Sequence, residues 1–286
     1  MPFIIEQNLC VDCGSCIGNC PNRAIIRRGS EVTITDMCCD CGTCIRFCGL
    51  GAIGKGKTKA EFNNVKLDKQ LKEKLLLTRN IVAMTFTDKA PKGVAVEDGL
   101  NFWCHICGDI FEENGKPVFF TAKNSVCGGS SALGLGTRRV NRDDVLTVME
   151  GMTGDGGYYN TIDLFTKSRS LYPQFSRVYG GMVLGPLEKV KMPDIILVPV
   201  NGKQMSMLAA AYAFETGERI PGNAGGGACL DSVIIPVMEN RPTFTCSDHG
   251  GRMHMRLKDE EILVCIPYRL VPGLVTNLDR TVYAKE

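Results

Sequence analysis

Eight cysteines near the start of this 286-residue chain have a spacing that suits metal chemistry. They form two runs of C-x2-C-x2-C-x3-C, and a ninth cysteine, Cys39, lies inside the second run. Thiolates bind zinc and iron-sulfur clusters, and runs this dense are too crowded for two separate tetrahedral zinc sites. The spacing therefore predicts a pair of [4Fe-4S] clusters. Cys39 has no place in this ligand set, and we assign it no role.

The two runs are copies of one repeated unit. Residues 10–25 and 38–53 match at nine of 16 positions, with an offset of 28 residues. In each copy, three thiolates on a Gly-containing loop can hold three corners of a cubane, whereas the fourth points away and ligates the other cluster. The first cluster is assigned to Cys10, Cys13, Cys16 and Cys48. The second cluster is assigned to Cys38, Cys41, Cys44 and Cys20.

The alternative for this head is a zinc ribbon or a purely structural metal module. Two complete copies in register disfavour it. Pro21 follows the first copy but Gly49 follows the second, a change that softens a turn without removing a ligand. Between the copies, residues 24–28 and 31–35 are β-prone and flank a turn signal, which predicts a hairpin.

Through these two cysteine runs, residues 1–54 resemble a bacterial-type two-[4Fe-4S] ferredoxin. The resemblance implies paired clusters that pass single electrons at low potential between a donor and a second centre, and hence a redox partner protein. A head of this size buries little apolar area, so we expect the clusters themselves to hold it together.

The overall composition excludes several classes of protein. With 33 Lys plus Arg against 31 Asp plus Glu, the formal net charge of +2 gives no general attraction to nucleic acid or anionic lipid. Apolar runs such as 195–200 and 207–214 are far shorter than the roughly 18 residues of a membrane span. The first residues lack a secretory pattern. We therefore expect a cytoplasmic protein of an anaerobic type, with reduced thiols and with neither nucleic-acid nor membrane partners.

A Gly- and Lys-rich stretch separates the head from the rest of the chain. We expect a first domain at 1–54, a linker at 55–64 and a larger domain at 65–286. The larger domain has predicted strands at 81–86, 194–200, 243–246 and 262–266, and predicted helices at 65–78, 203–215 and 267–278. This mixed order predicts a two-domain α+β or α/β fold, a small ferredoxin-like module followed by a larger mixed α/β domain.

Four segments of the larger domain place cysteine beside glycine or histidine. They are 103–108 with Cys104 and Cys107, 127–136 with Cys127, 225–229 with Cys229, and 245–252 with Cys246. Glycine lets the backbone approach a bulky group and leaves amide N–H groups facing a thiolate or phosphate, so these segments are predicted to converge as ligand loops. Cys265, inside an apolar run, is predicted to be a buried small hydrophobe.

The larger domain resembles the ArCR family, also called domain of unknown function 169, over most of residues 65–280. The resemblance is carried by a cysteine in an early helix, the Cys-x-x-Ser-Ser-Ala-Leu-Gly-Leu loop at Cys127, the runs Pro-Leu-Glu-Lys from Pro186 and Pro-Asp-Ile-Ile-Leu-Val from Pro193, the Ala-Cys-x-Asp segment at Cys229, and the Cys246 strand before Gly-Gly-Arg. It implies an architecture and no reaction.

A third iron-sulfur centre is the hypothesis that uses these cysteines. Its ligands would be Cys107, Cys127, Cys229 and Cys246, with Cys104 as a substitute. A two-cluster relay within the same chain needs an electron donor or acceptor within reach, and these thiols are the available material. The larger domain would then reduce a small substrate or a partner's metal centre. His249 and Arg252 are the candidate substrate contacts, as an acid/base group and an anion-binding guanidinium.

Two other functions stay open. Cys104 and Cys107 form a CxxC pair at a helix start, typical of a redox dithiol, so the chain could be a ferredoxin-linked disulfide reductase. No thioredoxin-like context surrounds that pair. Alternatively, the chain is a non-enzymatic electron-transfer adaptor whose larger domain docks to a partner enzyme. The Gly-rich loops at 128–136 and 222–227 match no dinucleotide or ATP motif.

Overall fold

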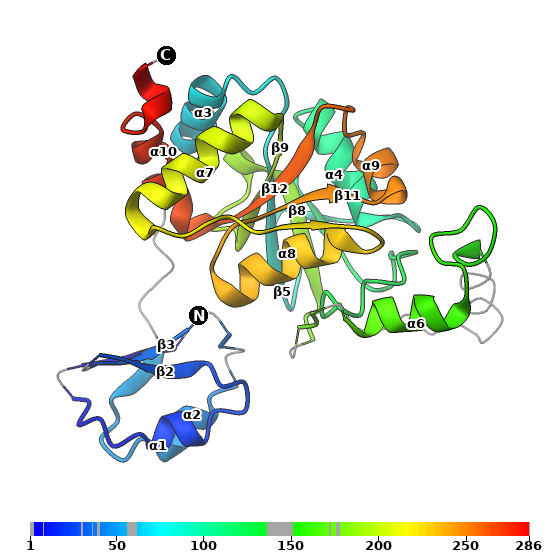
Figure 1. Ribbon diagram of the computed structural model, residues 1–286. Coiled ribbons are helices and arrows are strands. Elements are labelled where there is room, and N and C mark those ends of the chain that lie inside the picture. The colour runs from blue at the N-terminus through cyan, green and yellow to red at the C-terminus, as the bar shows by residue number, and fades with distance from the viewer. Residues whose placement is uncertain are drawn as a thin grey trace.

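The computed structural model describes residues 3–7, 9–29, 31–35, 37–38, 41–55, 62–135, 151–171, 173–175 and 178–285. Cys39, Gly136 and most of the expected linker, residues 56–61, lie outside the described residues. The described chain forms a small part, residues 3–55, and a larger part, residues 62–285 (Figure 1).

The small part consists of two strand pairs and two short helices. Its elements are β1 (Phe3–Ile5), α1 (Ser15–Gly18), β2 (Ile25–Arg28), β3 (Glu31–Ile34), α2 (Thr43–Phe47) and β4 (Ile53–Lys55). Strand β1 pairs with β4, and β2 pairs with β3, both antiparallel. The hairpin predicted between the two cysteine runs is therefore confirmed.

The 28-residue repeat is visible in the backbone of the small part. Helix α1 begins after Gly14 at φ 74°, and helix α2 begins after Gly42 at φ 73°. This left-handed conformation costs glycine little, which explains a glycine at the same place in each copy. The core of the small part consists of apolar side chains and two of the cysteines, namely Phe3, Cys16, Ile25, Val32, Cys44 and Ile53.

The larger part is built on one eight-stranded sheet. Its strands are β5 (Val82–Thr87), β6 (Ala95–Val96), β7 (Val118–Phe120), β8 (Gly181–Pro186), β9 (Ile195–Val200), β10 (Gly222–Ala224), β11 (Thr243–Ser247) and β12 (Ile262–Pro267). The spatial order is β10-β11-β12-β9-β5-β8-β7-β6. The β10–β11 and β6–β7 pairs are parallel and the other pairs are antiparallel. The mixed α/β architecture is thus confirmed.

Both faces of the sheet are covered by helices. The helices are α3 (Asn64–Leu75), α4 (Trp103–Glu112), α6 (Ile162–Ser170), α7 (Gly202–Thr216), α8 (Ala228–Glu239), α9 (His249–Met255) and α10 (Val271–Leu278), with short 3-10 helices η1 (Leu187–Lys189), η2 (Tyr268–Leu270) and η3 (Val282–Lys285). Along β5, Val82 and Met84 pack with α4, α8 and α9, whereas Ala83 packs with α3, α7 and α10. This alternation is expected of a strand buried on both faces.

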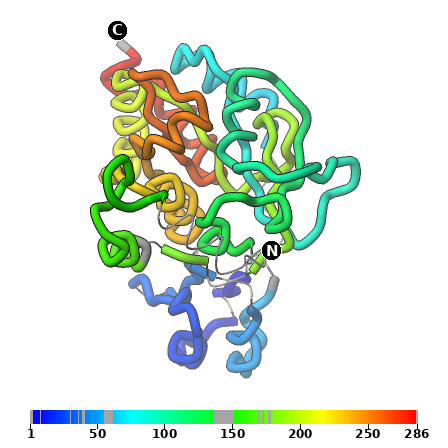
Figure 2. Tube along the Cα trace, turned by 90° about the vertical axis from the view of Figure 1, so that its right-hand side faces the viewer, coloured from blue at the N-terminus to red at the C-terminus, as the bar shows by residue number. Residues whose placement is uncertain are grey.

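Helix α10, near the C-terminal end of the chain, packs in the same layer as α3 and α7 on one face of the sheet. Helices α7 and α10, far apart in sequence, lie side by side in both views (Figures 1 and 2), and the Asn277 side chain donates a hydrogen bond of 3.1 Å to the Ala211 carbonyl. Helix α7 begins with a capping box made by Asn201 and Gln204. None of the helices in the described ranges has the length and apolar character that crossing a bilayer requires.

Candidate metal centres

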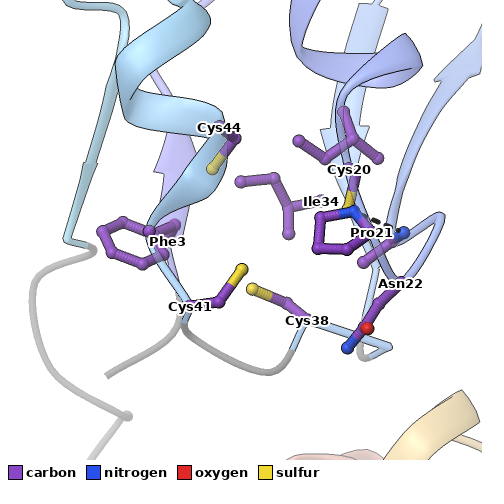
Figure 3. Close-up of a pocket in the computed structure, with 11 residues that line it drawn as sticks. Phe3, Cys20, Pro21, Asn22, Ile34, Cys38, Cys41 and Cys44 are labelled. Atoms are coloured by element: carbon purple, nitrogen blue, oxygen red, sulfur yellow. Dashed lines mark hydrogen bonds between the residues drawn. The ribbon is translucent and has the colours of Figure 1, made fainter. Parts of the chain in front are cut away.

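The eight cysteines of the small part line two separate pockets. One pocket is lined by Cys20, Cys38, Cys41 and Cys44, together with Phe3, Pro21 and Ile34. Figure 3 shows side chains from both copies of the repeat around this space, with the sulfur atoms of Cys38 and Cys41 turned toward each other. The other pocket is lined by Cys10, Cys13, Cys16 and Cys48. Each pocket therefore contains three cysteines of one copy of the repeat and the fourth cysteine of the other copy, which is the grouping expected from the spacing.

The fourth cysteine of each run accepts an equivalent backbone hydrogen bond on its sulfur. The backbone N–H of Ala24 donates to Cys20 Sγ at 3.2 Å, and the N–H of Ala52 donates to Cys48 Sγ, also at 3.2 Å. Such N–H groups stabilise negative charge on a ligating sulfur. The same local fold therefore places a backbone N–H on the sulfur of the fourth cysteine in each run.

Two cysteines lie between the pockets. Cys16 and Cys44 are buried, and burial raises the pKa of both thiols. The charges of Cys20, Cys41 and Cys16 raise the pKa of Cys44 further. Cys16 and Cys44 belong to different pockets but to the same packed core, so the two pockets adjoin through these buried residues.

The described cysteines of the two pockets do not have the geometry of a single-ion site. Zinc–sulfur bonds are about 2.3 Å long, so the sulfurs of a tetrahedral zinc site lie only about 3.8 Å apart. Among the residues that the structure describes, no group of three or more His, Cys, Asp or Glu side chains is arranged to hold a single ion. Four thiols around one pocket match the number of protein ligands of a [4Fe-4S] cluster.

In the larger part, three cysteines from three different elements approach one another. Cys104 is in the first turn of α4, Cys229 is in the first turn of α8, and Cys127 is in the loop after β7. The Val126 N–H donates to the Asn101 carbonyl at 3.1 Å, which holds the Cys127 loop beside the start of α4. A Cβ on Gly129 would lie 2.6 Å from Leu230, so the same loop also packs on the start of α8.

The three cysteines belong to one packed cluster, with Cys104 in the core and Cys127 and Cys229 packed against it. Burial, followed by the charge of Cys127, raises the pKa of Cys104 to about 12. Burial also raises the pKa of Cys229 well above its ordinary value, and the charges of Cys127, Asp248 and Cys104 raise it further. We call Cys104, Cys127 and Cys229 the three-thiol site.

Two residues from other elements complete the surroundings of the three-thiol site. Asp248 caps α9 by accepting the Gly251 N–H at 2.6 Å, and it accepts the Gly227 N–H, at the start of α8, at 2.9 Å. The Tyr158 hydroxyl accepts the Gly250 N–H at 2.8 Å. A Cβ on Gly250 would lie within 4 Å of both the Tyr158 hydroxyl and Asp248 Oδ1, which places this phenol beside Asp248. Burial raises the pKa of Tyr158.

Two of the four cysteines predicted for a third centre lie elsewhere. Cys107 is one turn further along α4 and fully buried, and its ionisable neighbours are Cys104, Cys265 and Asp109. Cys246 is exposed on β11, at a bulge where the pairing with β10 passes from Thr245 directly to Ser247. Of the predicted cysteines, the structure therefore brings together Cys127 and Cys229, with the substitute Cys104 in place of Cys107.

The two candidate substrate contacts differ in their surroundings. His249 is the exposed first residue of α9, next to Asp248. The Arg252 guanidinium donates to the carbonyls of Cys246, Lys258 and Glu261 at 3.2, 2.5 and 3.0 Å, and so closes the turn between α9 and β12. Sequence reasoning did not identify Asp248 and Tyr158 as site residues. An aspartate before His-Gly-Gly is a helix-cap signal that could have shown the first, and nothing local marks the second.

Comparison with known families agrees with this division of the chain. Residues 3–26 match the 4Fe-4S binding domain (Fer4), which supports an iron-sulfur electron-transfer role and a redox partner. Residues 70–277, the greater part of the chain, match the family described as uncharacterised ArCR, DUF169. No curated protein and no solved structure matches the chain. The chain therefore belongs to the ArCR family, with a ferredoxin-type 4Fe-4S domain fused in front of the family domain.

Proposed function

We propose that two [4Fe-4S] clusters in residues 1–54 relay low-potential electrons to a third iron-sulfur centre in residues 65–286, which reduces a small substrate or the metal centre of a partner. The linker in this scheme is 55–64. The observation that carries the proposal is the convergence of Cys104, Cys127 and Cys229 from three separate elements.

The relay in the small part rests on its two four-cysteine pockets. The ligands of one cluster are Cys10, Cys13, Cys16 and Cys48, and those of the other are Cys38, Cys41, Cys44 and Cys20. When bound, such clusters supply one-electron chemistry. The protein contributes the buried Cys16 and Cys44 between the clusters and the N–H groups on Cys20 and Cys48. These groups keep the two centres adjacent and help to set their potentials.

The third centre rests on the way in which three thiols from three separate elements are brought together. Three side chains that repel each other once ionised are held together by a glycine-containing loop and two helix starts. A packed core gains nothing from that arrangement, since each cysteine behaves there as an ordinary small hydrophobe. Loss of the thiol protons on metal binding converts the same arrangement into a cluster site.

Iron analysis of the full chain, purified without oxygen, tests the proposal. We expect about 12 irons and 12 sulfides per wild-type chain and about eight in Cys229→Ser and in Cys127→Ser. Cys246→Ser is the matched control, because Cys246 is exposed and lies outside the three-thiol site, and it should keep about 12. About eight irons in the wild type itself would refute the third centre. The chain would then serve as an electron-transfer adaptor whose larger domain docks to a partner enzyme.

The disulfide-reductase alternative depends on Cys104 and Cys107. Both lie on α4, but Cys107 has no exposed surface and burial raises its pKa well above the ordinary value. Attack on a disulfide needs an accessible thiolate, so the fit of this pair is poor. Alkylation before and after reduction with dithionite separates the functions, because permanently ligated cysteines react in neither state.

A further inference from the structure

We propose that the third centre leaves one iron without a protein thiolate, and that this iron binds a small oxygen-donor ligand to which the Tyr158 hydroxyl donates a hydrogen bond. This inference rests on the proposed function and specifies the chemical class of its substrate. A [4Fe-4S] cubane has four irons, and the three-thiol site has three sulfurs for them.

The other described cysteines of the larger part do not complete the set. Cys107 faces the core beside Cys265, and Cys246 is turned to solvent at the bulge of β11. The nearest carboxylate is that of Asp248, and each of its oxygens already accepts a backbone N–H, one from Gly227 and one from Gly251. These two hydrogen bonds hold the Asp248 carboxylate on the helix starts, and we assign the fourth corner of a cluster to an external ligand.

Tyr158 supplies the recognition of that ligand. A phenol has one proton to donate, and its oxygen accepts hydrogen bonds. The Tyr158 oxygen accepts the Gly250 N–H at 2.8 Å, which fixes the hydroxyl and leaves its proton to be donated. A Cβ on Gly250 would lie 3.8 Å from the Tyr158 hydroxyl and 3.7 Å from Asp248 Oδ1, so the hydroxyl lies on the Asp248 side of the three-thiol site. A hydrogen-bond donor at this place selects a ligand that carries an oxygen acceptor.

Buried polar groups beside the site also lack partners. Among the described residues, Trp103 Nε1 and Ser247 Oγ have no hydrogen-bond partner, although Trp103 is fully buried and Ser247 nearly so. Trp103 directly precedes Cys104 in the sequence, and Ser247 directly precedes Asp248. Ser247 also has a positive φ of 61°, which is strained for a non-glycine residue. Unsatisfied donors and strain next to a site are typical of a place built for a group that binds there.

Mild oxidation of the full chain tests for an iron without a protein thiolate. Ferricyanide removes one electron from such a [4Fe-4S] cluster, which releases one ferrous ion and leaves a [3Fe-4S] cluster with its own EPR signal. We expect wild type to release about one iron per chain more than Cys229→Ser, which lacks the third centre and reports the ferredoxin clusters alone. Added ferrous ion together with one electron from dithionite should restore the original spectrum.

Water labelled with oxygen-17 is the probe for an oxygen donor at that iron. We expect hyperfine coupling to the label in the reduced wild type and none in Cys229→Ser. Acetate should displace the labelled water, and Tyr158→Phe should raise the acetate concentration required by about two- to tenfold, the effect of one lost hydrogen bond. Tyr158→Phe should keep about 12 irons, which shows that the site is intact.

The outcomes separate this inference from the proposed function. About 12 irons with no labile iron and no coupling to labelled water would mean that a protein group fills the fourth corner, so that the inference fails while the third centre stands. About eight irons in the wild type would remove the third centre and the inference with it. An unchanged acetate requirement in Tyr158→Phe would overturn the role of Tyr158 alone.

Discussion

Asp248 accepts a hydrogen bond of 2.9 Å from the backbone N–H of Gly227, and this contact joins the start of α9 to the start of α8. Cys229 follows two residues after Gly227, so its position depends on a carboxylate that is remote in sequence. The other oxygen of Asp248 caps α9 through Gly251. The Asp248 side chain therefore holds both helix starts together. The start of α8 carries Cys229, and the start of α9 carries Gly250, which donates its N–H to Tyr158.

Replacing Asp248 should destabilise the larger part. Asp248→Ala removes the cap of α9, which costs about 1–2 kcal/mol, and it leaves the Gly227 N–H without its acceptor, which costs about 1–3 kcal/mol more. Asp248→Asn keeps one carbonyl oxygen as an acceptor and should lose less. Urea unfolding of the two variants beside wild type measures the difference. Equal stability of Asp248→Ala and wild type would show that this contact does not hold the helices.

Gly129 should resist even a single methyl group. A Cβ at this residue would lie 2.6 Å from the Leu230 side chain, so Gly129→Ala must push the Cys127 loop away from α8 or repack Leu230. Overpacking of this kind costs about 1–3 kcal/mol, and we also expect partial loss of iron from the third centre. Gly202→Ala is the matched control, because a Cβ there meets nothing within 4 Å. If both variants unfold at the same urea concentration, the loop does not pack as described.

Local patterns in the sequence predicted much of the fold. The apolar run before α7 was correctly predicted as a strand, β9, and the leucine spacing near residue 70 as a helix, α3. Strand β8 was missed because glycines stand near both of its ends. Gly181 packs against Phe119 and Phe120, where a Cβ would meet atoms at 2.5 Å, and only the folded sheet reveals that contact. Helix α9 was missed for a similar reason, since its two consecutive glycines resemble a loop.

The two candidate sites also differ in how far they could be predicted from the sequence. The eight cysteines of the small part could be grouped from spacing because each pocket draws three of its thiols from one short run. The three-thiol site joins elements separated by about a hundred residues, as in Cys127 and Cys229. The choice between Cys104 and Cys107 could not be made from the sequence. The two are one turn apart on α4, and only the packing against Cys265 shows which of them faces the core.

The stability of the larger part should fall in mild acid because of His254. Burial, followed by the charge of His105, lowers the pKa of His254 below its ordinary value of 6.5, although Asp248 acts in the opposite direction. The unfolded chain therefore binds a proton that the folded chain does not, and stability is lost as the pH falls from about 6.5 through the folded pKa. The His254 ring stacks on Phe102 at 4.2 Å and lies 6.0 Å from the ring of His105.

Unfolding in urea at pH 7.5 and pH 6.0 measures this effect. Wild type should lose more stability between the two conditions than His254→Asn. His249→Asn is the control for replacing a histidine of the same helix. A drop in His254→Asn as large as that in wild type would assign the acid sensitivity to other groups.

Removal of iron should unfold the small part and spare the larger sheet. The small part has few buried apolar side chains, and its remaining core consists of cysteines placed to ligate clusters. Such a core does not offset the entropy of ordering the chain, so cluster binding supplies the folding free energy. The larger part has two extensive apolar clusters on opposite faces of its sheet and does not depend on metal in this way. After chelation, a protease should cut within residues 3–55 and leave a fragment of the larger part, whereas the holoprotein should resist cleavage there. Protection of residues 3–55 in iron-free protein would show that this part folds without its clusters.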